Sequence, residues 1–329
     1  MTRSDVFYAR LSDDVMRRMV TAALGGDVHL RSWRELHGGL YNLTYLVELD
    51  GCEHSRLVLR AGPPAAHELH SESRLLENEV AVLPLLADLS VGVPQTIAYD
   101  GTRAVLDRAY ALQTVVDGEP AIPVLRRLST RAHAAFYTQL GRITREVHAL
   151  EGPGFGAVLG ATHARLAGAV VESLDAIAAD CRSLGLDDRD LTAVTAWVDA
   201  HAEVFDRAPT PRLLAGDLWT PNLLVDPDAS APPIITGAVD FDRAWWGDPA
   251  ADWTIRMAHR LDRPDRDAFC EGYGALEPTG HEAAARSLVY EARHLGAVLL
   301  ERSRLGAPRV RVDDTRAALG ATRAALESV

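Results

Sequence analysis

The sequence feature that most constrains the fold is a break in helical periodicity between residues 213 and 246. Two short apolar runs lie there, residues 223–225 and 234–235, with a proline-rich turn between them. If the runs pair as an antiparallel hairpin, Asn222 enters the first strand and Asp240 leaves the second, so they lie side by side, about 5 Å apart. Asp217 lies five residues before Asn222 on a loop. The pairing would bring three polar side chains together within a helical region.

The residue types at these three positions indicate phosphate chemistry. Mg²⁺ keeps few protein ligands and binds substrate phosphates with its remaining positions, so the amide oxygen of Asn222 and the carboxylate of Asp240 form a sufficient cradle. Asp217 would then face a γ-phosphate and accept the proton of an incoming hydroxyl. Each residue alone is an ordinary turn former, and their order and intervals carry the prediction.

The first third of the chain is predicted to be a small antiparallel sheet with one long helix. A helix is expected to open at Ser12 and to stop at Gly25-Gly26. Alternating apolar residues predict strands over 28–36, 42–49 and 57–60, and again near 96–99 and 110–115. The long helix is predicted over 68–89, where apolar residues recur at helical spacing.

Beyond residues 117–120 the pattern becomes helical. Helices are predicted over 130–150, 161–182, 191–204, 249–257, 282–305 and 312–326. A chain of 329 residues also suits two lobes better than one core. We therefore predict an α+β, two-lobed fold, with an N-terminal lobe over 1–116 and a mainly helical C-terminal lobe over 117–329.

Composition excludes several classes of function. The net charge of −12 argues against nucleic-acid binding, which needs clustered basic residues. All 34 basic residues are arginine, which excludes a lysine Schiff base and a lysine-containing P-loop. Cys52, Cys181 and Cys270 show no CxxC spacing and are expected to be idle thiols. Since neither a membrane span nor an apolar signal segment is evident, a cytoplasmic protein is expected.

Three segments together resemble a known family. They are Gly-Asp-Leu-Trp-x-x-Asn at 216–222, Val-Asp-Phe-Asp at 239–242, and the trailing Trp-Gly-Asp-Pro-Ala-Ala-Asp-Trp at 246–253. This arrangement resembles the aminoglycoside phosphotransferase family of the protein-kinase-like superfamily. The resemblance implies a kinase-like fold and transfer of the γ-phosphoryl group of ATP or GTP, with Mg²⁺, to a small-molecule hydroxyl. It makes Asp217 the catalytic residue and Asn222 and Asp240 the metal ligands.

The resemblance extends to a nucleotide site in the first lobe. The run at 37–42 resembles the family's glycine-containing loop, Arg60 stands in the place of the strand residue that contacts phosphates, and Glu79 matches the helix acid that pairs with it. Residues 113–116 would form the hinge whose backbone binds the purine. The implied nucleotide-binding residues are Gly38, Gly39, Asn42, Arg60, Glu79, Gln113, Val115 and Val116.

One position departs from the family's pattern. Ala215 stands where the family usually has a histidine, and together with Arg60 in the usual lysine place this keeps a nucleotide-binding pseudokinase open as an alternative. His148 is interpreted as a packed helix residue. Asp248 and Asp252 are interpreted as helix caps or braces of the catalytic loop.

The acceptor is the least constrained prediction. Relatives in the family phosphorylate aminoglycosides, basic peptides and nucleoside antibiotics, so we expect an antibiotic acceptor and a resistance or self-resistance role. The Gly-Asp-Leu-Trp run at 216–219 also resembles fructosamine kinases, which leaves a ketosamine or another metabolite as the alternative acceptor. Trp219 could line the acceptor site, whereas Trp245, Trp246 and Trp253 are expected in the core. Acidic candidates for binding a cationic acceptor are Asp265, Glu271, Glu291 and Glu301.

Overall fold

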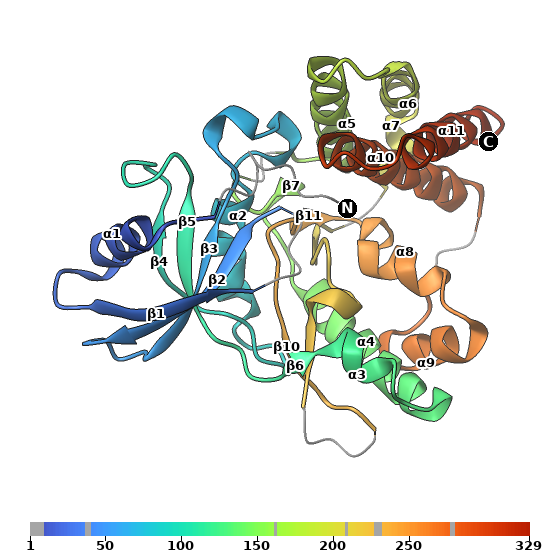
Figure 1. Cartoon of the computed structure of the whole chain (residues 1–329). Coiled ribbons are helices and arrows are strands. Elements are labelled where there is room, and N and C mark those ends of the chain that lie inside the picture. Colours follow the sequence, from blue (N-terminus) through green and yellow to red (C-terminus); the bar gives the residue numbers. More distant parts are fainter. Residues whose placement is uncertain (1–9, 37–40, 161–162, 208–209, 227–231, 277–279) are drawn as a thin grey trace.

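The computed structural model describes residues 10–36, 41–160, 163–207, 210–226, 232–276 and 280–329. A small antiparallel sheet occupies the N-terminal part and helices make up most of the rest, so the predicted fold class is confirmed (Figure 1). No described helix is long and apolar enough to cross a membrane.

The N-terminal sheet has the strand order β1-β2-β3-β5-β4, and each neighbouring pair is antiparallel. Its first helix, α1 (Asp13–Leu24), begins at Ser12 as predicted and buries Met16, Met19 and Val20 against the sheet residues. The alternation in the sequence produces one buried face, seen most clearly in β2. The strands are β1 (His29–Glu35), β2 (Leu43–Asp50), β3 (Arg56–Ala61), β4 (Thr96–Asp100) and β5 (Tyr110–Thr114).

The long helix predicted over 68–89 was wrong in its extent. The α-helix α2 covers only Leu75–Val82. Two 3-10 turns precede it, η1 (Ala65–His67) and η2 (His70–Glu72), and a third, η3 (Leu83–Leu86), follows it. Arg74 has a left-handed backbone with φ of 60°, which stops the helix from extending backwards. The carboxylate of Asp180 accepts hydrogen bonds from the backbone N–H groups of His70 and Ser71. A contact 110 residues away in sequence therefore overrides the local helical periodicity.

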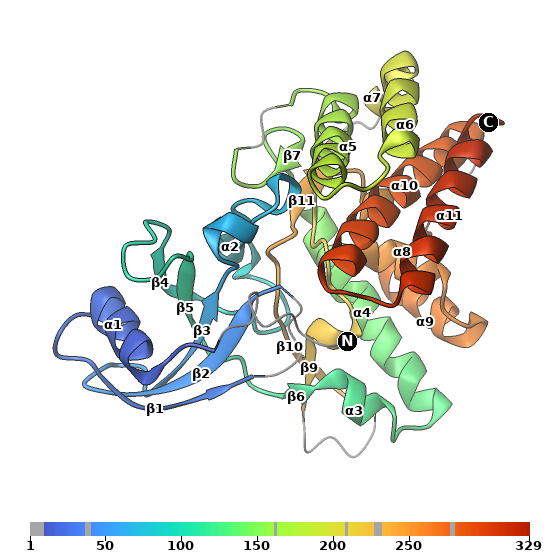
Figure 2. The same cartoon turned by 45° about the horizontal axis from the view of Figure 1, so that its top comes forward.

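The C-terminal part is built mainly from helices (Figure 2). Their buried side chains form two hydrophobic clusters. The helices predicted from periodicity are present with shifted ends. Two described helices, α3 and α9, were not predicted, because α3 is short and α9 lies in a strongly charged stretch. The helices are α3 (Ala121–Leu125), α4 (Thr130–Ala149), α5 (Leu166–Ser183), α6 (Arg189–Ala200), α7 (Ala202–Asp206), α8 (Trp253–His259), α9 (Arg263–Tyr273), α10 (His281–Arg304) and α11 (Arg309–Leu326).

Two three-stranded sheets support the loops between these helices. The predicted hairpin is confirmed: β9 and β10 are antiparallel, and Leu223 lies opposite Ala238. The central strand of the other sheet, β11, carries Trp245 and Trp246, which are buried as predicted. The strands are β6 (Glu119–Pro120), β9 (Leu223–Val225) and β10 (Ile235–Ala238) in one sheet, and β7 (Gly156–Ala157), β8 (Arg212–Leu214) and β11 (Trp245–Gly247) in the other.

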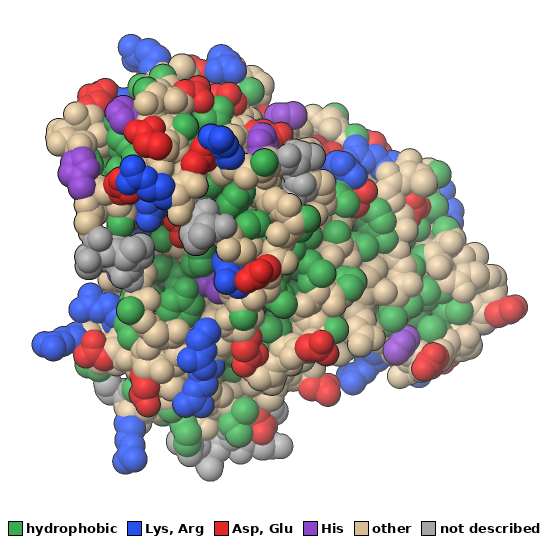
Figure 3. All heavy atoms as spheres, turned by 180° about the vertical axis from the view of Figure 1, so that it is seen from behind, with side chains coloured by type: hydrophobic (Ala, Val, Ile, Leu, Met, Phe, Trp, Pro, Cys, Tyr) green, Lys and Arg blue, Asp and Glu red, His purple; other side chains and the backbone are tan. Residues whose placement is uncertain are grey.

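The sheet region and the helical region interlock rather than meet at one chain position. Val82, Leu83 and Leu86, at the end of α2, lie in the buried cluster of the helical part. Gly92 pairs with Gly237 of β10 as a parallel bridge. On the face shown in Figure 3, acidic and basic side chains of the described residues are interspersed. The proposed boundary at 116/117 falls between β5 and β6, and it stays a prediction.

Candidate active site

The loop after β8 carries Asp217 and is held in a tight conformation. Gly216 has a φ of 81°, and a Cβ atom there would lie 2.3 Å from the carbonyl oxygen of Arg243, so only glycine fits. Asn222 ends the 3-10 turn η4 (Thr220–Asn222), and its Nδ2 donates to the backbone oxygen of Asp217 at 2.9 Å and to its Oδ2 at 3.0 Å. The amide thereby fixes the direction of the Asp217 carboxylate.

Asp252, the N-cap of α8, supports the same loop by binding its backbone. Its carboxylate accepts from the backbone N–H groups of Ala215 at 2.9 Å and Gly216 at 3.2 Å. His148 of α4 is buried and contacts Asp252 through Nε2 at 2.9 Å. The predictions of a packed histidine and of a bracing aspartate are confirmed. Because the brace binds the backbone of Ala215, it does not need a histidine side chain at that position.

The hairpin places the predicted metal ligands together. The backbone N–H of Val239 donates to the carbonyl oxygen of Asn222 at 2.9 Å, so Val239 lies opposite Asn222 and Asp240 is the next residue along the chain. Asp240 has a φ of 69°, a left-handed conformation that residues other than glycine adopt at a cost of about 1–3 kcal/mol. Such strain is typical of functional positions.

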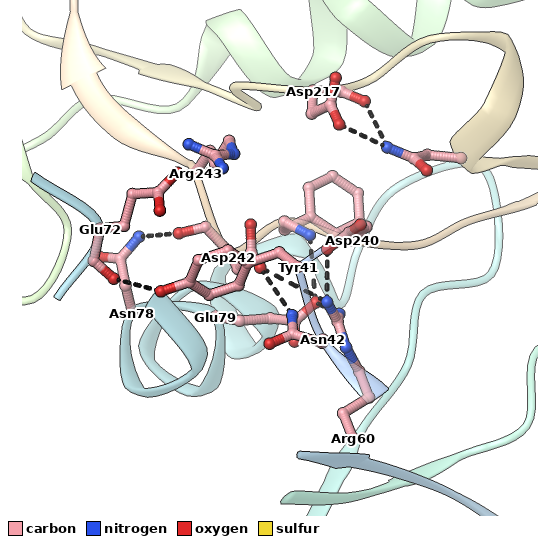
Figure 4. Close-up of polar contacts among 12 residues, drawn as sticks. Tyr41, Asn42, Arg60, Glu72, Asn78, Glu79, Asp217, Asp240, Asp242 and Arg243 are labelled. Atoms are coloured by element: carbon pink, nitrogen blue, oxygen red, sulfur yellow. Dashed lines mark hydrogen bonds and ion pairs between the residues drawn. The ribbon is translucent and has the colours of Figure 1, made fainter. Parts of the chain in front are cut away.

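The predicted ion pair between Arg60 and Glu79 is confirmed. Figure 4 shows Arg60, from β3, bonded to Glu79 of α2 and to Asp240, with Asp242 at 3.5 Å. Glu79 is fully buried. Its carboxylate also accepts hydrogen bonds from Nε2 of Gln113 at 3.0 Å and from the backbone N–H of Phe241 at 3.1 Å. The sheet, α2 and the loop after β10 are therefore joined through one guanidinium group.

The carboxylates of this site repel one another. Burial, and then the charge of Asp240, raise the pKa of Asp217 to about 7. The same two causes raise the pKa of Asp242 to about 8, against the opposing effects of Arg60 and Arg243. A group that accepts protons near neutral pH suits a general base, so the position of Asp217 fits the role predicted for it.

The donor set fits a magnesium ion. Asn222 uses its Nδ2 hydrogens on Asp217, which leaves its amide oxygen as a ligand. Asp240, just beyond the paired strand, supplies a carboxylate that also pairs with Arg60. Both are hard oxygen donors of the kind that Mg²⁺ prefers. Asp217, Asp240 and Asp242 place three carboxyl groups close together, and a divalent cation would neutralise their negative charge. Asn222 and Asp240 would hold the ion.

The remaining predicted nucleotide residues lie around this centre. Asn42 is buried, and its Nδ2 donates to Asp242 at 3.0 Å. Gln113 lies within β5 between two paired strands, so its backbone is used by the sheet and its side chain binds Glu79. Val115 and Val116 follow β5 and are half-buried. Gly38 and Gly39 lie outside the described residues.

A second layer of polar residues could not be predicted from the sequence. Asn78 of α2 donates to the backbone oxygens of Asp242 at 3.0 Å and Ala244 at 2.8 Å. Buried Glu72 pairs with Arg243 at 2.9 Å and, from the end of α10, with Arg304 at 2.6 Å. Figure 4 shows this layer beside the Arg60 network. Asp242, the second aspartate of the 239–242 run, was the one sequence feature that could have indicated this layer. No local sequence pattern distinguishes Asn78 or Glu72 from other polar residues.

A sequence profile described as Phosphotransferase enzyme family matches residues 32–286. The chain belongs to this family. Its match covers β2, β3, α2, the Asp217 loop and the β9–β10 hairpin, so Asp217, Asn222, Asp240, Arg60 and Glu79 all lie within the matched segment. No curated protein sequence matches the chain.

Solved structures similar to this phosphotransferase share its fold at low sequence identity. The GDP complex of wild-type aminoglycoside 2'-phosphotransferase-IIIa has a TM-score of 0.62 and 20% identity over 95% of this chain and 99% of its own. Macrolide 2'-phosphotransferase MphH from Brachybacterium faecium has a TM-score of 0.55 and 18% identity over 94% and 97%. ADP-bound aminoglycoside phosphotransferase APH(2'')-Ib has a TM-score of 0.60 and 14% identity over 96% and 99%.

Proposed function

We propose that this protein transfers the γ-phosphoryl group of ATP or GTP to a hydroxyl of a small molecule, with Asp217 as the catalytic base. The observation that carries the proposal is the hydrogen bond between Asn222 and Asp217. It lies at the start of the β9–β10 hairpin, and Asp240 follows the end of that hairpin. The GDP and ADP bound in two similar structures support a purine nucleotide as the donor.

The proposed reaction is an in-line displacement. The acceptor's hydroxyl oxygen bonds to the γ-phosphorus, the bond from that phosphorus to the β–γ bridging oxygen breaks, and the nucleoside diphosphate leaves. The hydroxyl proton passes to Asp217. Asn222 donates to Oδ2 of Asp217. Oδ1 of Asp217 receives no hydrogen bond from the described residues, so it is available to the hydroxyl of the substrate. When bound, Mg²⁺ would neutralise the nucleotide phosphates.

The nucleotide is assigned to the junction between the sheet and the helical part. Arg60, held by buried Glu79, would supply positive charge to the phosphates, and an arginine can bind them through two N–H groups at once. Asn42 supports this centre through Asp242. We assign the purine to the backbone of 115–116, since Gln113 is paired within the sheet, and the phosphate loop to Gly38 and Gly39. The lobes would then be 1–116 and 117–329.

The acceptor class we propose is a hydroxylated antibiotic, in a resistance or self-resistance role. Similar structures have been solved with kanamycin and with gentamicin. The donor nucleotides are abundant in the cytoplasm, where we place the protein.

Mass spectrometry of phosphate transfer tests the proposal. The protein is incubated with Mg·ATP or Mg·GTP and a panel of hydroxylated antibiotics and ketosamines, beside Asp217→Asn and a control, Asp313→Asn, which makes the same chemical change on exposed α11. We expect one added phosphate on one class of compound, at least about 1,000-fold slower in Asp217→Asn and unchanged in the control. Transfer to ketosamines alone would assign a metabolite kinase. Tight nucleotide binding without turnover would assign a pseudokinase.

A further inference from the structure

A wall of aromatic and arginine side chains borders Asp217 on the side of α8 and α10. Trp219 follows Asp217 by two residues, and the hydroxyl of Thr254 in α8 donates to the backbone oxygen of Leu218 at 2.5 Å. Figures 1 and 2 both show α8 beside α10. We name as the acceptor wall Trp219, Trp253, Arg243, Arg256, Arg260, Arg293 and His294.

The aromatic part of the wall leads away from the base. Trp253, predicted to lie in the core, is instead half-buried, and its ring stacks on His294 of α10 at 3.9 Å. Trp219 meets the edge of Trp253 at 6.2 Å and 85°, which is its one ring contact within the part of the chain that the structure describes. Trp219 is also half-buried. A flat, apolar part of an acceptor can therefore stack on the Trp219 indole while its hydroxyl reaches Asp217.

The charged part of the wall has more arginine than carboxylate. Glu291 is shared between Arg256 and Arg260, and Glu72 is shared between Arg243 and Arg304. Each glutamate thus serves two guanidinium groups. Among the described residues, the charged side chains around the wall are six arginines, Arg243, Arg256, Arg260, Arg293, Arg302 and Arg304, and five carboxylates, Glu72, Glu291, Glu301, Asp217 and Asp242.

Two of these arginines have unused capacity for an anion. The side chain of Arg256 is 10% exposed, and its buried Nε has no hydrogen-bond partner among the described residues. Arg293 donates to the hydroxyl of Ser173 at 2.6 Å and lies over the ring of Trp245 at 4.9 Å, with no carboxylate of the described chain at ion-pair distance. Guanidinium groups that are buried without a full anionic partner favour an anionic ligand.

His294 reports the sign of the local potential. Burial, and then the positive charges of Arg256, Arg260, Arg293 and Arg243, lower its pKa to about 3. The ring therefore stays neutral in the physiological range and adds no positive charge of its own. Burial is the larger cause of this shift, and a polycation placed here would meet the repulsion from the four arginines that adds to it.

Resting on the proposed function, we propose that the acceptor is a hydroxyl compound with a flat apolar ring system and an acidic group, rather than a polycation. The ring lies against Trp219, the acidic group pairs with Arg260, whose side chain is 50% exposed, and the hydroxyl points to Asp217. Glu301 and Glu291, predicted as sites for a cationic acceptor, instead partly neutralise the arginines of the wall.

Binding of matched probes tests this assignment. The probes are 6-hydroxymethyl-2-naphthoate, its primary amide, its 2-aminomethyl counterpart, and kanamycin. Dissociation constants are measured by calorimetry on the full chain with Mg²⁺ and a non-hydrolysable ATP analogue. We expect the naphthoate to bind at least ten-fold more tightly than the amine and more tightly than kanamycin. Arg260→Gln and Trp219→Leu should each weaken the naphthoate at least five-fold, whereas Arg309→Gln, on exposed α11, should not.

Each outcome decides the matter. Equal binding of naphthoate and amine, tighter binding of kanamycin, or no binding of the naphthoate would overturn the assignment, and thermal unfolding of each variant excludes misfolding as the cause. Hydrolysis of ATP or GTP by water is recorded beside these titrations for the wild type and Asp217→Asn. Asp217-dependent hydrolysis supports the proposed function whatever the probes do, so a wrong acceptor class and a wrong reaction are told apart.

Discussion

Replacing Asp217 with asparagine should stabilise the nucleotide-free protein at alkaline pH while it removes phosphoryl transfer. The asparagine keeps an oxygen that can accept the Nδ2 hydrogens of Asn222, so the loop geometry is retained. It removes the cost of a half-buried carboxylate that faces Asp240. A destabilising carboxylate is expected where the proposed function needs a base whose burial is only partly offset by a positive neighbour, here Arg243.

The magnitude follows from the pKa of Asp217, which rises from 3.8 to about 7 on folding. Between these values only the folded state binds the proton, so stability falls as pH rises through this interval and stays reduced above it. At about 1.4 kcal/mol per pH unit the loss is at most ~4 kcal/mol, and partial exposure of the side chain reduces it to ~2 kcal/mol. For a chain of this length that corresponds to roughly 3 °C in Tm.

Calorimetric scans at pH 4 and pH 8, without nucleotide or Mg²⁺, measure the effect. Asp217→Asn should match the wild type at pH 4 and exceed it by roughly 3 °C at pH 8. Asp313→Asn, on exposed α11, should match the wild type at both values. The reasoning is refuted if Asp217→Asn is no more stable than the wild type at pH 8, or if the gain is the same at both pH values.

Three further variants test the framework around the base. Gly216→Ala should abolish activity and lower the yield of folded protein, because the new Cβ would lie 2.3 Å from the carbonyl oxygen of Arg243; a normal Tm would contradict this. Arg60→Ala should cost about 3–5 kcal/mol, since it leaves Glu79 buried without its partner, and Arg60→Met with Glu79→Met should recover most of that loss in denaturant unfolding. Asp252→Ala should lower kcat by at least about ten-fold with little change in nucleotide affinity by calorimetry; an equal loss in both would point to general unfolding.

Much of the candidate site could be predicted because its members are close in sequence. Asp217 and Asn222 lie on one loop, and a hairpin of short apolar runs brings Asp240 back beside them, so spacing alone determines the neighbourhood. Alternation and helical periodicity likewise predicted the sheet strands and most helices, since one buried face is enough to set their period.

The tertiary structure decided what depends on distant partners. The helix predicted over 68–89 is broken where Asp180 takes the backbone of His70 and Ser71, an interaction that local periodicity cannot contain. The contact of Asn42 with Asp242 spans 200 residues.

The electrostatics of the site belong to the same category. Asp217 and Asp242 have raised pKa values because folding removes water and brings Asp240 close. His294 has a lowered pKa because its ring is buried and because four arginines from separate positions surround it. The sequence by itself determined which groups the proposed chemistry uses. Folding decided their charge at a given pH, and the sign of the potential that an acceptor meets, because both depend on burial and distance in three dimensions.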